Sequence, residues 1–301
     1  MAYQESGATA VVQSSYPLVL LTPAAIHGAD PREKAEFRLP SLRGVWRYWW
    51  RTLQDEPNHE KLLAKEEEWF GGTRKTKQQS PVHLTLARAM EGTMRENILP
   101  HRTSPTFVPA LPAGGEVTVT LSVRKRHQER LAQYDWHFQY MLHLASFGQR
   151  SRRGFGAVQW TEHQWDHVEE YGESLRMTLE RIGAADAFSF AERGCLVARR
   201  EDIATPHPVL SAVWVGEGKE SAAEVVKAFG RASHEANRYG SLGYMRGKEG
   251  KLSSPLWCTV RKIGGRYYPI VTEVRNHDSR YSEPRYERDR NRFLEIVGVR
   301  I

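Results

Sequence analysis

One segment constrains the fold more than any other: residues 41–53 read SLRGVWRYWWRTL and carry three tryptophans within five positions. Apolar residues stand at 42, 45, 46, 49, 50 and 53, the one-sided spacing of a helix that turns about 100° per residue. Ser41 follows Pro40 and suits the N-cap position. The segment predicts a helix with a buried apolar face, and a chain of 301 residues is long enough to form a core around it.

The first half of the chain contains further segments with the patterns of regular structure. Strands are predicted at residues 16–21, 82–87, 117–123 and 157–161, and helices at 60–69 and 134–147. The resulting order of strand, helix, strand, strand, helix, strand is typical of the ferredoxin-like fold. We therefore expect an α+β protein whose N-terminal domain, residues 1–165, is ferredoxin-like, as in RRM-like and RAMP domains.

The second half has weaker patterns of the same kind. Strands are predicted at residues 194–199 and 209–215, helices at 221–231 and 286–297, and a hairpin of 257–262 with 267–271. A length of 301 residues is also typical of two domains. We expect a second, degenerate ferredoxin-like domain over residues 166–301.

Composition narrows the function. The formal charge of +7 favours a polyanionic partner. The two cysteines, Cys195 and Cys258, form no CxxC pair, which excludes the usual multi-cysteine zinc sites. The early apolar run at residues 16–21 is far shorter than the roughly 20 residues of a membrane span. We expect a cytoplasmic protein with no membrane contact, metal or cofactor.

Residues 146–156 read SFGQRSRRGFG and are called the Gly/Arg loop below. Like charges repel and glycine is costly to order, so this segment suits an anionic partner better than a core. Arginines can contact phosphates while glycines expose backbone N–H groups, and Phe155 could stack on a base or anchor the loop in the core. The loop precedes a predicted strand, so it matches no dinucleotide or P-loop motif. The predicted RNA contacts here are Gly148, Arg150, Arg152, Arg153, Gly154, Phe155 and Gly156.

A second group of arginines lies on the predicted tryptophan helix. Arg43, Arg47 and Arg51 recur every four positions and so share one side of the helix. No acidic residue stands four positions from any of them before Asp55, so they either extend into solvent or face phosphates. Further basic runs supply the remaining predicted RNA contacts, which are Arg74, Lys75 and Lys125.

Two residues keep a catalytic alternative open. In the stretch IHGAD, His27 could act as a general base toward a ribose hydroxyl, and Asp30 could hold a metal near a phosphate. The neighbourhood lacks the second carboxylate of a two-metal site. The favoured explanation is local structure, in which Gly28 makes a turn, His27 packs and Asp30 caps or forms a local hydrogen bond. His163 and His167 have the spacing of a helical zinc pair, but no third ligand is evident, so we expect a Glu-rich surface helix there.

Taken in order, several motifs resemble the RAMP superfamily of CRISPR-associated proteins, in particular the RAMP subunits of type III-B (Cmr) effector complexes. The motifs are LTPAAIHGAD (21–30), FRLPSLRGVWRYWWR (37–51), WFGGT (69–73), SPVHL (80–84), FGQRSRRGFGAV (147–158) and KLSSPLW (251–257).

The resemblance implies two ferredoxin-like domains, binding of the three-prime region of crRNA, contacts to neighbouring RAMP subunits and a part in capturing target RNA for antiviral defence. It places Arg43 and Arg47 on a helix that faces the RNA groove. The expected function is therefore a non-catalytic RNA-binding subunit. The alternative is a RAMP endoribonuclease that processes repeat RNA or cuts target RNA through His27 or Asp30.

Overall fold

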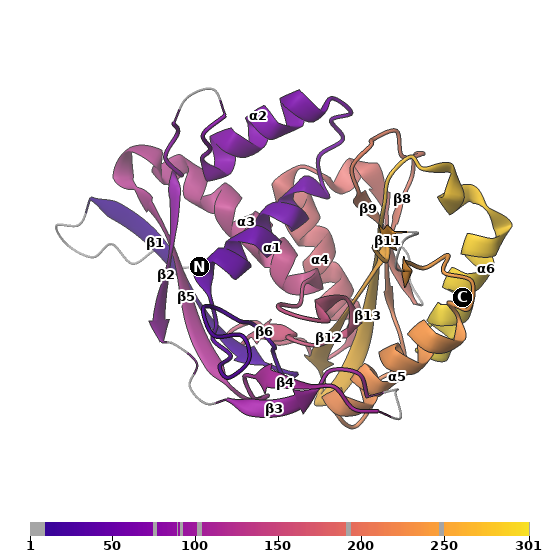
Figure 1. Ribbon diagram of the computed structural model, residues 1–301. Helices are drawn as coiled ribbons and strands as arrows, with labels where there is room; N and C mark the ends of the chain where they lie inside the picture. Colours follow the sequence, from indigo (N-terminus) through magenta and orange to yellow (C-terminus); the bar gives the residue numbers. More distant parts are fainter. Residues whose placement is uncertain are drawn as a thin grey trace.

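The computed structural model describes residues 10–74, 77–88, 90, 93–100, 104–190, 194–246 and 250–300. Four layers follow one another across the molecule: a sheet, a layer of helices, a second sheet and an outer pair of helices (Figure 1). The inner helices are α1 (Leu39–Arg51), α3 (Leu131–Leu144) and α4 (Val168–Ile182). The outer helices are α5 (Ala222–Glu235) and α6 (Pro284–Ile296).

The first sheet is antiparallel and has the strand order β2-β5-β1-β6. Its strands are β1 (Val11–Leu20), β2 (Val82–Arg88), β5 (Glu116–Arg124) and β6 (Val158–Trp160). The connection from β1 to β2 holds α1 and α2 (His59–Phe70), and α3 joins β5 to β6. A small hairpin of β3 (Met94–Asn97) and β4 (Phe107–Ala110), not predicted, lies between β2 and β5. The predicted strands and helices of this half occur in the predicted order, with ends shifted by a few residues.

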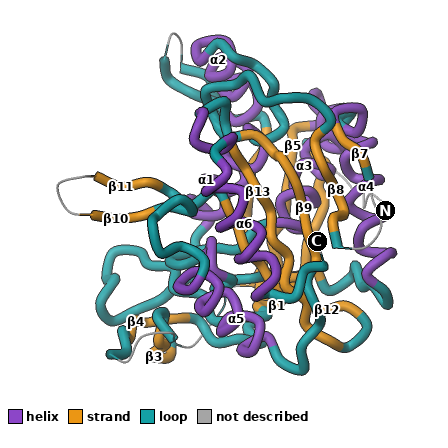
Figure 2. Tube along the Cα trace, turned by 90° about the vertical axis from the view of Figure 1, so that its right-hand side faces the viewer, coloured by secondary structure: helices purple, strands orange, loops and turns teal. Residues whose placement is uncertain are grey.

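The second sheet has the order β12-β13-β9-β8-β7, also antiparallel. Its strands are β7 (Phe188–Ser189), β8 (Cys195–Arg199), β9 (Val209–Val215), β12 (Leu256–Ile263) and β13 (Arg266–Arg275). Position by position, β12-β13-β9-β8 corresponds to β2-β5-β1-β6 of the first sheet. The difference is that β8 precedes β9 in the chain, whereas β6 follows β1. A hairpin of β10 (Tyr244–Arg246) and β11 (Gly250–Leu252) projects from the body (Figure 2).

Helix α1 begins two residues earlier than predicted. Its N-cap is Arg38, in extended conformation, and Pro40 lies in the first turn. Proline suits that turn because its fixed φ is helical and its missing N–H would have no intrahelical partner, so the predicted N-cap at Ser41 is wrong. The buried face is as predicted: Trp46 is fully buried, with its ring edge-on to Phe138 of α3 at 5.3 Å between centroids.

The same helix also packs against the second sheet. The ring of Trp49 lies 5.5 Å from that of Trp257 on β12, and the Trp257 indole N–H donates to the Tyr48 hydroxyl at 2.9 Å. Leu210 and Val213 of β9 belong to the same buried cluster. The core is therefore continuous across residues 165 and 166, where the sequence predicts a domain boundary.

A fully buried arginine joins the two halves. Arg261 of β12 has no exposed surface, and its guanidinium donates to the carbonyls of Leu142, His143 and Ala145, with 3.1 Å to the last two. These carbonyls end α3, where the helix leaves acceptors unpaired and carries partial negative charge. Burial lowers the pKa of Arg261 to about 10, so the side chain stays charged at neutral pH. The C-terminus of α3 is thus capped by a cation from the second half.

Replacing Arg261 should destabilise the whole chain. Arg261→Met keeps much of the volume but leaves the buried Leu142 carbonyl without its side-chain donor and takes one of two donors from the His143 and Ala145 carbonyls, so we expect the free energy of unfolding to fall by about 3 kcal/mol. Urea denaturation measures this. The matched control is Arg266→Met, an exposed residue of the same hairpin, with an expected change within about 0.5 kcal/mol. Equal losses for the two variants would contradict the role of Arg261.

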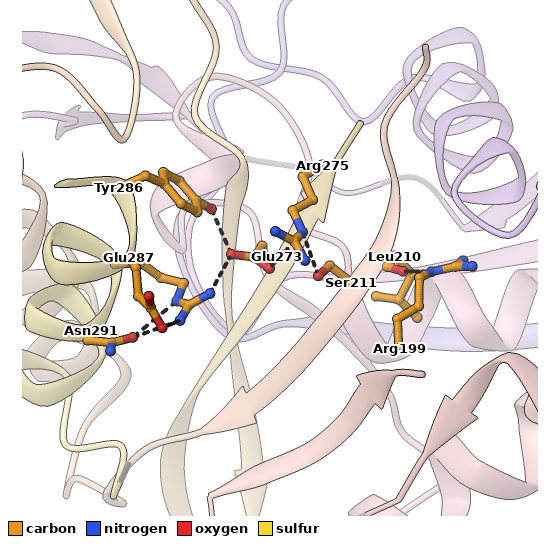
Figure 3. Close-up of polar contacts among 9 residues, drawn as sticks. Arg199, Leu210, Ser211, Glu273, Arg275, Tyr286, Glu287 and Asn291 are labelled. Atoms are coloured by element: carbon orange, nitrogen blue, oxygen red, sulfur yellow. Dashed lines mark hydrogen bonds and ion pairs between the residues drawn. The ribbon is translucent and has the colours of Figure 1, made fainter. Parts of the chain in front are cut away.

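Other arginines of the second half are also occupied within the fold (Figure 3). Buried Glu273 on β13 accepts from the Tyr286 hydroxyl at 2.7 Å and faces Arg290 of α6 at 3.5 Å. Arg275 donates to the Ser211 hydroxyl at 3.1 Å, and Arg199 donates to the Leu210 carbonyl at 2.8 Å. Part of the excess positive charge thus holds α6 and the strands together.

Candidate nucleic-acid interface

The Gly/Arg loop connects α3 to β6 and has a tightly specified backbone. Its left-handed residues are Gly148, Arg150, Gly154 and Gly156. A Cβ on Gly156 would lie 1.9 Å from the Phe147 carbonyl oxygen, and one on Gly148 would lie 2.5 Å from that of Ala25. Glycine is therefore required at both positions by close approach of backbone as well as by φ.

Contrary to the prediction, the N–H groups of Gly154 and Gly156 form hydrogen bonds within the protein. Gly154 donates to the carbonyl of Cys258 on β12 at 3.0 Å, and Gly156 donates to that of Pro23 after β1 at 2.8 Å. Backbone bonds therefore tie the loop to both halves of the molecule. The prediction that these two groups are exposed to a phosphate is wrong.

Phe155 is the core anchor, the second of the two roles considered for it. The side chain is 3% exposed and belongs to the buried cluster that contains Val225 and Phe229 of α5. A base cannot stack on a ring that is covered in this way. The flanking glycines let the chain turn inward at this point.

Two of the three loop arginines hold the second half in place. The Arg152 guanidinium lies 4.4 Å from the centre of the Trp257 ring and donates to the Ser254 carbonyl. Burial lowers the pKa of Arg152 below its ordinary value. Arg153 donates to the Leu256 carbonyl at 3.1 Å. Both side chains keep partial exposure, but their polar groups are engaged with β12 and the residues before it.

The solvent-facing part of the loop is residues 148–150, where Gly148 and Gln149 are exposed and Arg150 is half-buried. It lies against the connection after β1: the Gln149 N–H donates to the Ala25 carbonyl at 2.9 Å. Within that connection the Arg38 guanidinium donates to the His27 carbonyl at 3.0 Å. Arg95 of β3 donates to the Arg32 carbonyl at 3.2 Å.

These contacts define one basic surface, which we call the loop surface. Sequence reasoning found only Arg150 among its cations. The mixed charge of residues 29–38 was an available signal for three of the others, and Arg95 lies on a strand that was not predicted. Lys34 and Arg32 are exposed there. The cations of the loop surface are Arg32, Lys34, Arg38, Arg95 and Arg150.

The two catalytic candidates lie at the edge of the loop surface. The His27 Nε2–H donates to the Pro109 carbonyl at 2.8 Å, and its Nδ1 accepts from the Gln149 amide at 3.3 Å. Both ring nitrogens are thus engaged. Asp30 is exposed, and among the residues described no group of three or more His, Cys, Asp or Glu could hold a metal ion.

The arginine stripe of α1 has a partner that the sequence did not reveal. Glu66 of α2 is buried and accepts from the Nε groups of both Arg47 and Arg51. Burial alone would raise the pKa of Glu66, but the hydrogen bonds from the two arginines lower it below its ordinary value. Arg43 donates to the Val82 carbonyl at 2.9 Å. Helical spacing revealed no acidic partner because this one comes from another helix.

The remaining predicted contacts lie away from the loop surface or outside the described residues. Lys125 follows β5 at the end of the sheet where β1 begins, about 30 Å from the loop surface at roughly 3.3 Å per residue. Arg74 faces Glu60 and Glu67 of α2, each at 3.8 Å. Lys75 lies outside the described residues.

The histidine pair has no helical geometry. Helix α4 begins at Val168, so His163 lies in the preceding turn, where its Nε2 lies 3.3 Å from the Ser174 hydroxyl, and His167 is the N-cap. The Glu-rich helix itself is present, with Glu169 and Glu170 in its first turn. Over the described part of the chain, no helix is long and apolar enough to cross a membrane.

Comparison with known proteins gives a family match over part of the chain. The family model of the RAMP superfamily matches residues 18–159, which include all of α1 and the Gly/Arg loop. This segment is therefore similar to the RAMP superfamily.

The chain is also similar to particular proteins and solved structures. The chain is 24% identical over 276 residues to the CRISPR system Cmr subunit Cmr1-1 of Pyrococcus furiosus, covering 79% of this chain and 80% of that protein. It is similar in fold to the crystal structure of apo Cmr1 from Pyrococcus furiosus, with a TM-score of 0.59, 20% identity and 88% of each chain covered. A chain of the cryo-EM structure of Type III-B Cmr-beta bound to cognate target RNA and AMPPnP also gives 0.59, at 10% identity, over 94% of this chain and 98% of that one.

Glu66 should act as a structural carboxylate. Glu66→Gln leaves two arginines without a counter-charge, so we expect the free energy of unfolding at pH 7 to fall by about 2 kcal/mol. The folded pKa is depressed, so this contribution is present above the ordinary glutamate pKa and is lost as pH falls through the folded value. Urea denaturation of both proteins at pH 7 and pH 3 tests this. A difference that is as large at pH 3 as at pH 7 would show that the effect is not one of charge.

Proposed function

We propose that this chain is a non-catalytic RNA-binding subunit of a type III-B CRISPR ribonucleoprotein, where it holds the three-prime region of crRNA and helps to capture target RNA for antiviral defence. The superfamily match and the similarity to Cmr1-1 support this proposal. So does the likeness to a chain of a Cmr-beta complex that is bound to cognate target RNA. Its partners would be crRNA, target RNA and neighbouring RAMP subunits in the cytoplasm.

We infer that both halves are ferredoxin-like units, the second one permuted. The strand order β2-β5-β1-β6, with helices after β1 and after β5, is that of a β-α-β-β-α-β unit. In the second half β9, α5, β12, β13 and α6 follow the same order, and β8 replaces the final strand. This arrangement supports a domain division close to residues 1–165 and 166–301.

The RNA contact that we propose is the loop surface, and the carrying observation is its gathering of five cations from three separate segments. Five cations against the three acidic residues of segment 29–38, Asp30, Glu33 and Glu36, leave an excess of positive charge, which favours a phosphate backbone. Arg32 and Lys34 are exposed, and Arg150 lies at the solvent-facing end of the loop, so these three are the principal candidates. Arg38 is paired with Glu36 at 3.3 Å. Arg152, Arg153 and the arginines of α1 then act mainly by holding the fold.

Salt dependence tests this assignment. Replacing Arg32, Lys34 and Arg150 together with Ala should flatten the slope of log affinity against log salt by up to about 2, since each lost single-stranded phosphate contact removes roughly 0.7. The measurement is crRNA binding by fluorescence anisotropy over a salt series.

A charge-matched control separates a local contact from net charge. Arg231, Arg288 and Arg292 are exposed on α5 and α6, and their replacement with Ala removes the same charge elsewhere. We expect the control to keep the slope of the unmodified chain. An unchanged slope in the loop-surface variant, or an equal loss in the control, would contradict the assignment.

An RNA cleavage assay distinguishes the non-catalytic proposal from the nuclease alternative. Since both His27 nitrogens are engaged and Asp30 has no cluster of ligands around it, we expect labelled RNA to stay intact with or without EDTA. Cleavage that requires a divalent metal and disappears in Asp30→Ala would establish the alternative. Cleavage that persists in EDTA and disappears in His27→Ala would do so by the metal-independent route.

A further inference from the structure

A cavity of about 480 Å³ lies where the two halves meet, away from the loop surface. Residues from α1, α2 and α3 line one side, and residues from the end of α4, β7 and β8 line the other. Its aromatic lining consists of Trp50, Trp69, Phe188 and His137. Cavities of 300–1,000 Å³ with apolar walls and a few polar groups are typical of binding sites.

His137 offers this cavity a fixed hydrogen-bond acceptor. The side chain is 4% exposed, and its Nδ1–H donates to the Gln133 carbonyl at 2.9 Å, so the lone pair is on Nε2. Within the described residues Nε2 has no hydrogen-bond partner. Burial lowers the pKa of His137 to about 4, which keeps the ring neutral at physiological pH. A ligand group that meets this atom must therefore be a donor.

The charged groups of the lining favour a cation. The lining contains two carboxylates, Asp55 and Asp186, and one cation, Arg199, so it has an excess of one negative charge. Arg199 also shows how a guanidinium is held here: it lies 5.0 Å from the centre of the Phe188 ring and donates to both carboxylate oxygens of Asp55, at 3.0 and 3.1 Å. Asp186 is exposed, so its carboxylate is accessible from solvent.

We propose that this cavity binds an arginine side chain of a neighbouring protein subunit. The planar guanidinium would stack on an indole face and donate to His137 Nε2 and the Asp186 carboxylate. A guanidinium carries five donors and no acceptor, which matches an acceptor-rich, aromatic and net negative lining. A nucleotide fits less well, because its phosphate would be repelled by the same charges. The proposal goes beyond RNA binding and does not depend on it.

Calorimetric titration of the full chain at low salt tests this with a compact probe, N-acetyl-L-arginine methylamide. The matched probe is the citrulline derivative, which has the same shape and no charge. We expect saturable binding of the arginine probe and at least tenfold weaker binding of the citrulline probe. Absence of saturable binding, or equal binding of the two probes, would overturn the proposal. Binding of adenosine 5′-monophosphate in place of the arginine probe would overturn it in favour of a nucleotide site.

Variants locate the binding. Asp186→Asn should weaken the arginine probe at least fivefold, whereas Asp202→Asn, an equally exposed aspartate outside the lining, should leave it unchanged. His137→Phe keeps an aromatic ring and removes the acceptor, and a second loss is expected there if circular dichroism shows native structure. If that variant fails to fold, the Asp186 and Asp202 pair decides alone. Equal affinity in Asp186→Asn and the unmodified chain would place the probe elsewhere and overturn the proposal.

Discussion

The fold depends on the bonds between Arg261 and the C-terminus of α3. A helix end that is buried between two sheets has carbonyls that no water can reach. Here one guanidinium, which has no carboxylate partner among the described residues, donates to three of them, and the hydroxyls of Tyr171 and Thr259 supply second donors to two. The contact fixes α3 against β12, and the Ser146 hydroxyl, which donates to the Thr259 hydroxyl at 2.7 Å, fixes the start of the Gly/Arg loop beside it. The geometry of the candidate interface therefore originates in the core.

The same principle governs most of the arginines that were singled out in the sequence. Arginines that look available in the sequence have partners in the folded structure. Glu66 forms ion pairs with two arginines of α1, Arg152 stacks on Trp257, and Arg290 forms an ion pair with Glu273. Arginine suits such sites because its planar, weakly hydrated cation stacks on rings and donates several bonds at once. The formal charge of +7 is therefore a poor guide to the surface, because many of the arginines that contribute to it are engaged within the fold.

Much of the fold was predictable because the spacing of apolar residues along a helix or strand shows which of its faces is buried. The tryptophan helix, the strands of both sheets except the two-residue β7, and the β12–β13 hairpin all follow from local patterns. Long-range partners do not, because spacing along one element says nothing about an acid such as Glu66 that comes from another. Helix α4 was only partly found, since its Glu-rich face obscures the buried Tyr171 and Leu175. The roles of Arg152 and Phe155 depend on β12 and α5, far away in the chain, so the loop's own sequence could not distinguish binding from anchoring.

The bonds of the Gly/Arg loop to Ser254, Leu256 and Cys258 determine when the loop can complete its folding during synthesis. During synthesis the loop leaves the ribosome about a hundred residues before the strand that holds it. Until β12 has emerged and paired, the left-handed turn at Gly154 lacks its backbone bond to Cys258, whereas the turns at Gly148 and Gly156 already have partners in the segment after β1. A polypeptide interrupted in its second half would keep the contacts of residues 25–38 with Arg95 and Gln149 that gather the cations of the loop surface, but it would leave Arg152 and Arg153 without their acceptors at Ser254 and Leu256 and add two ungrouped cations beside that surface.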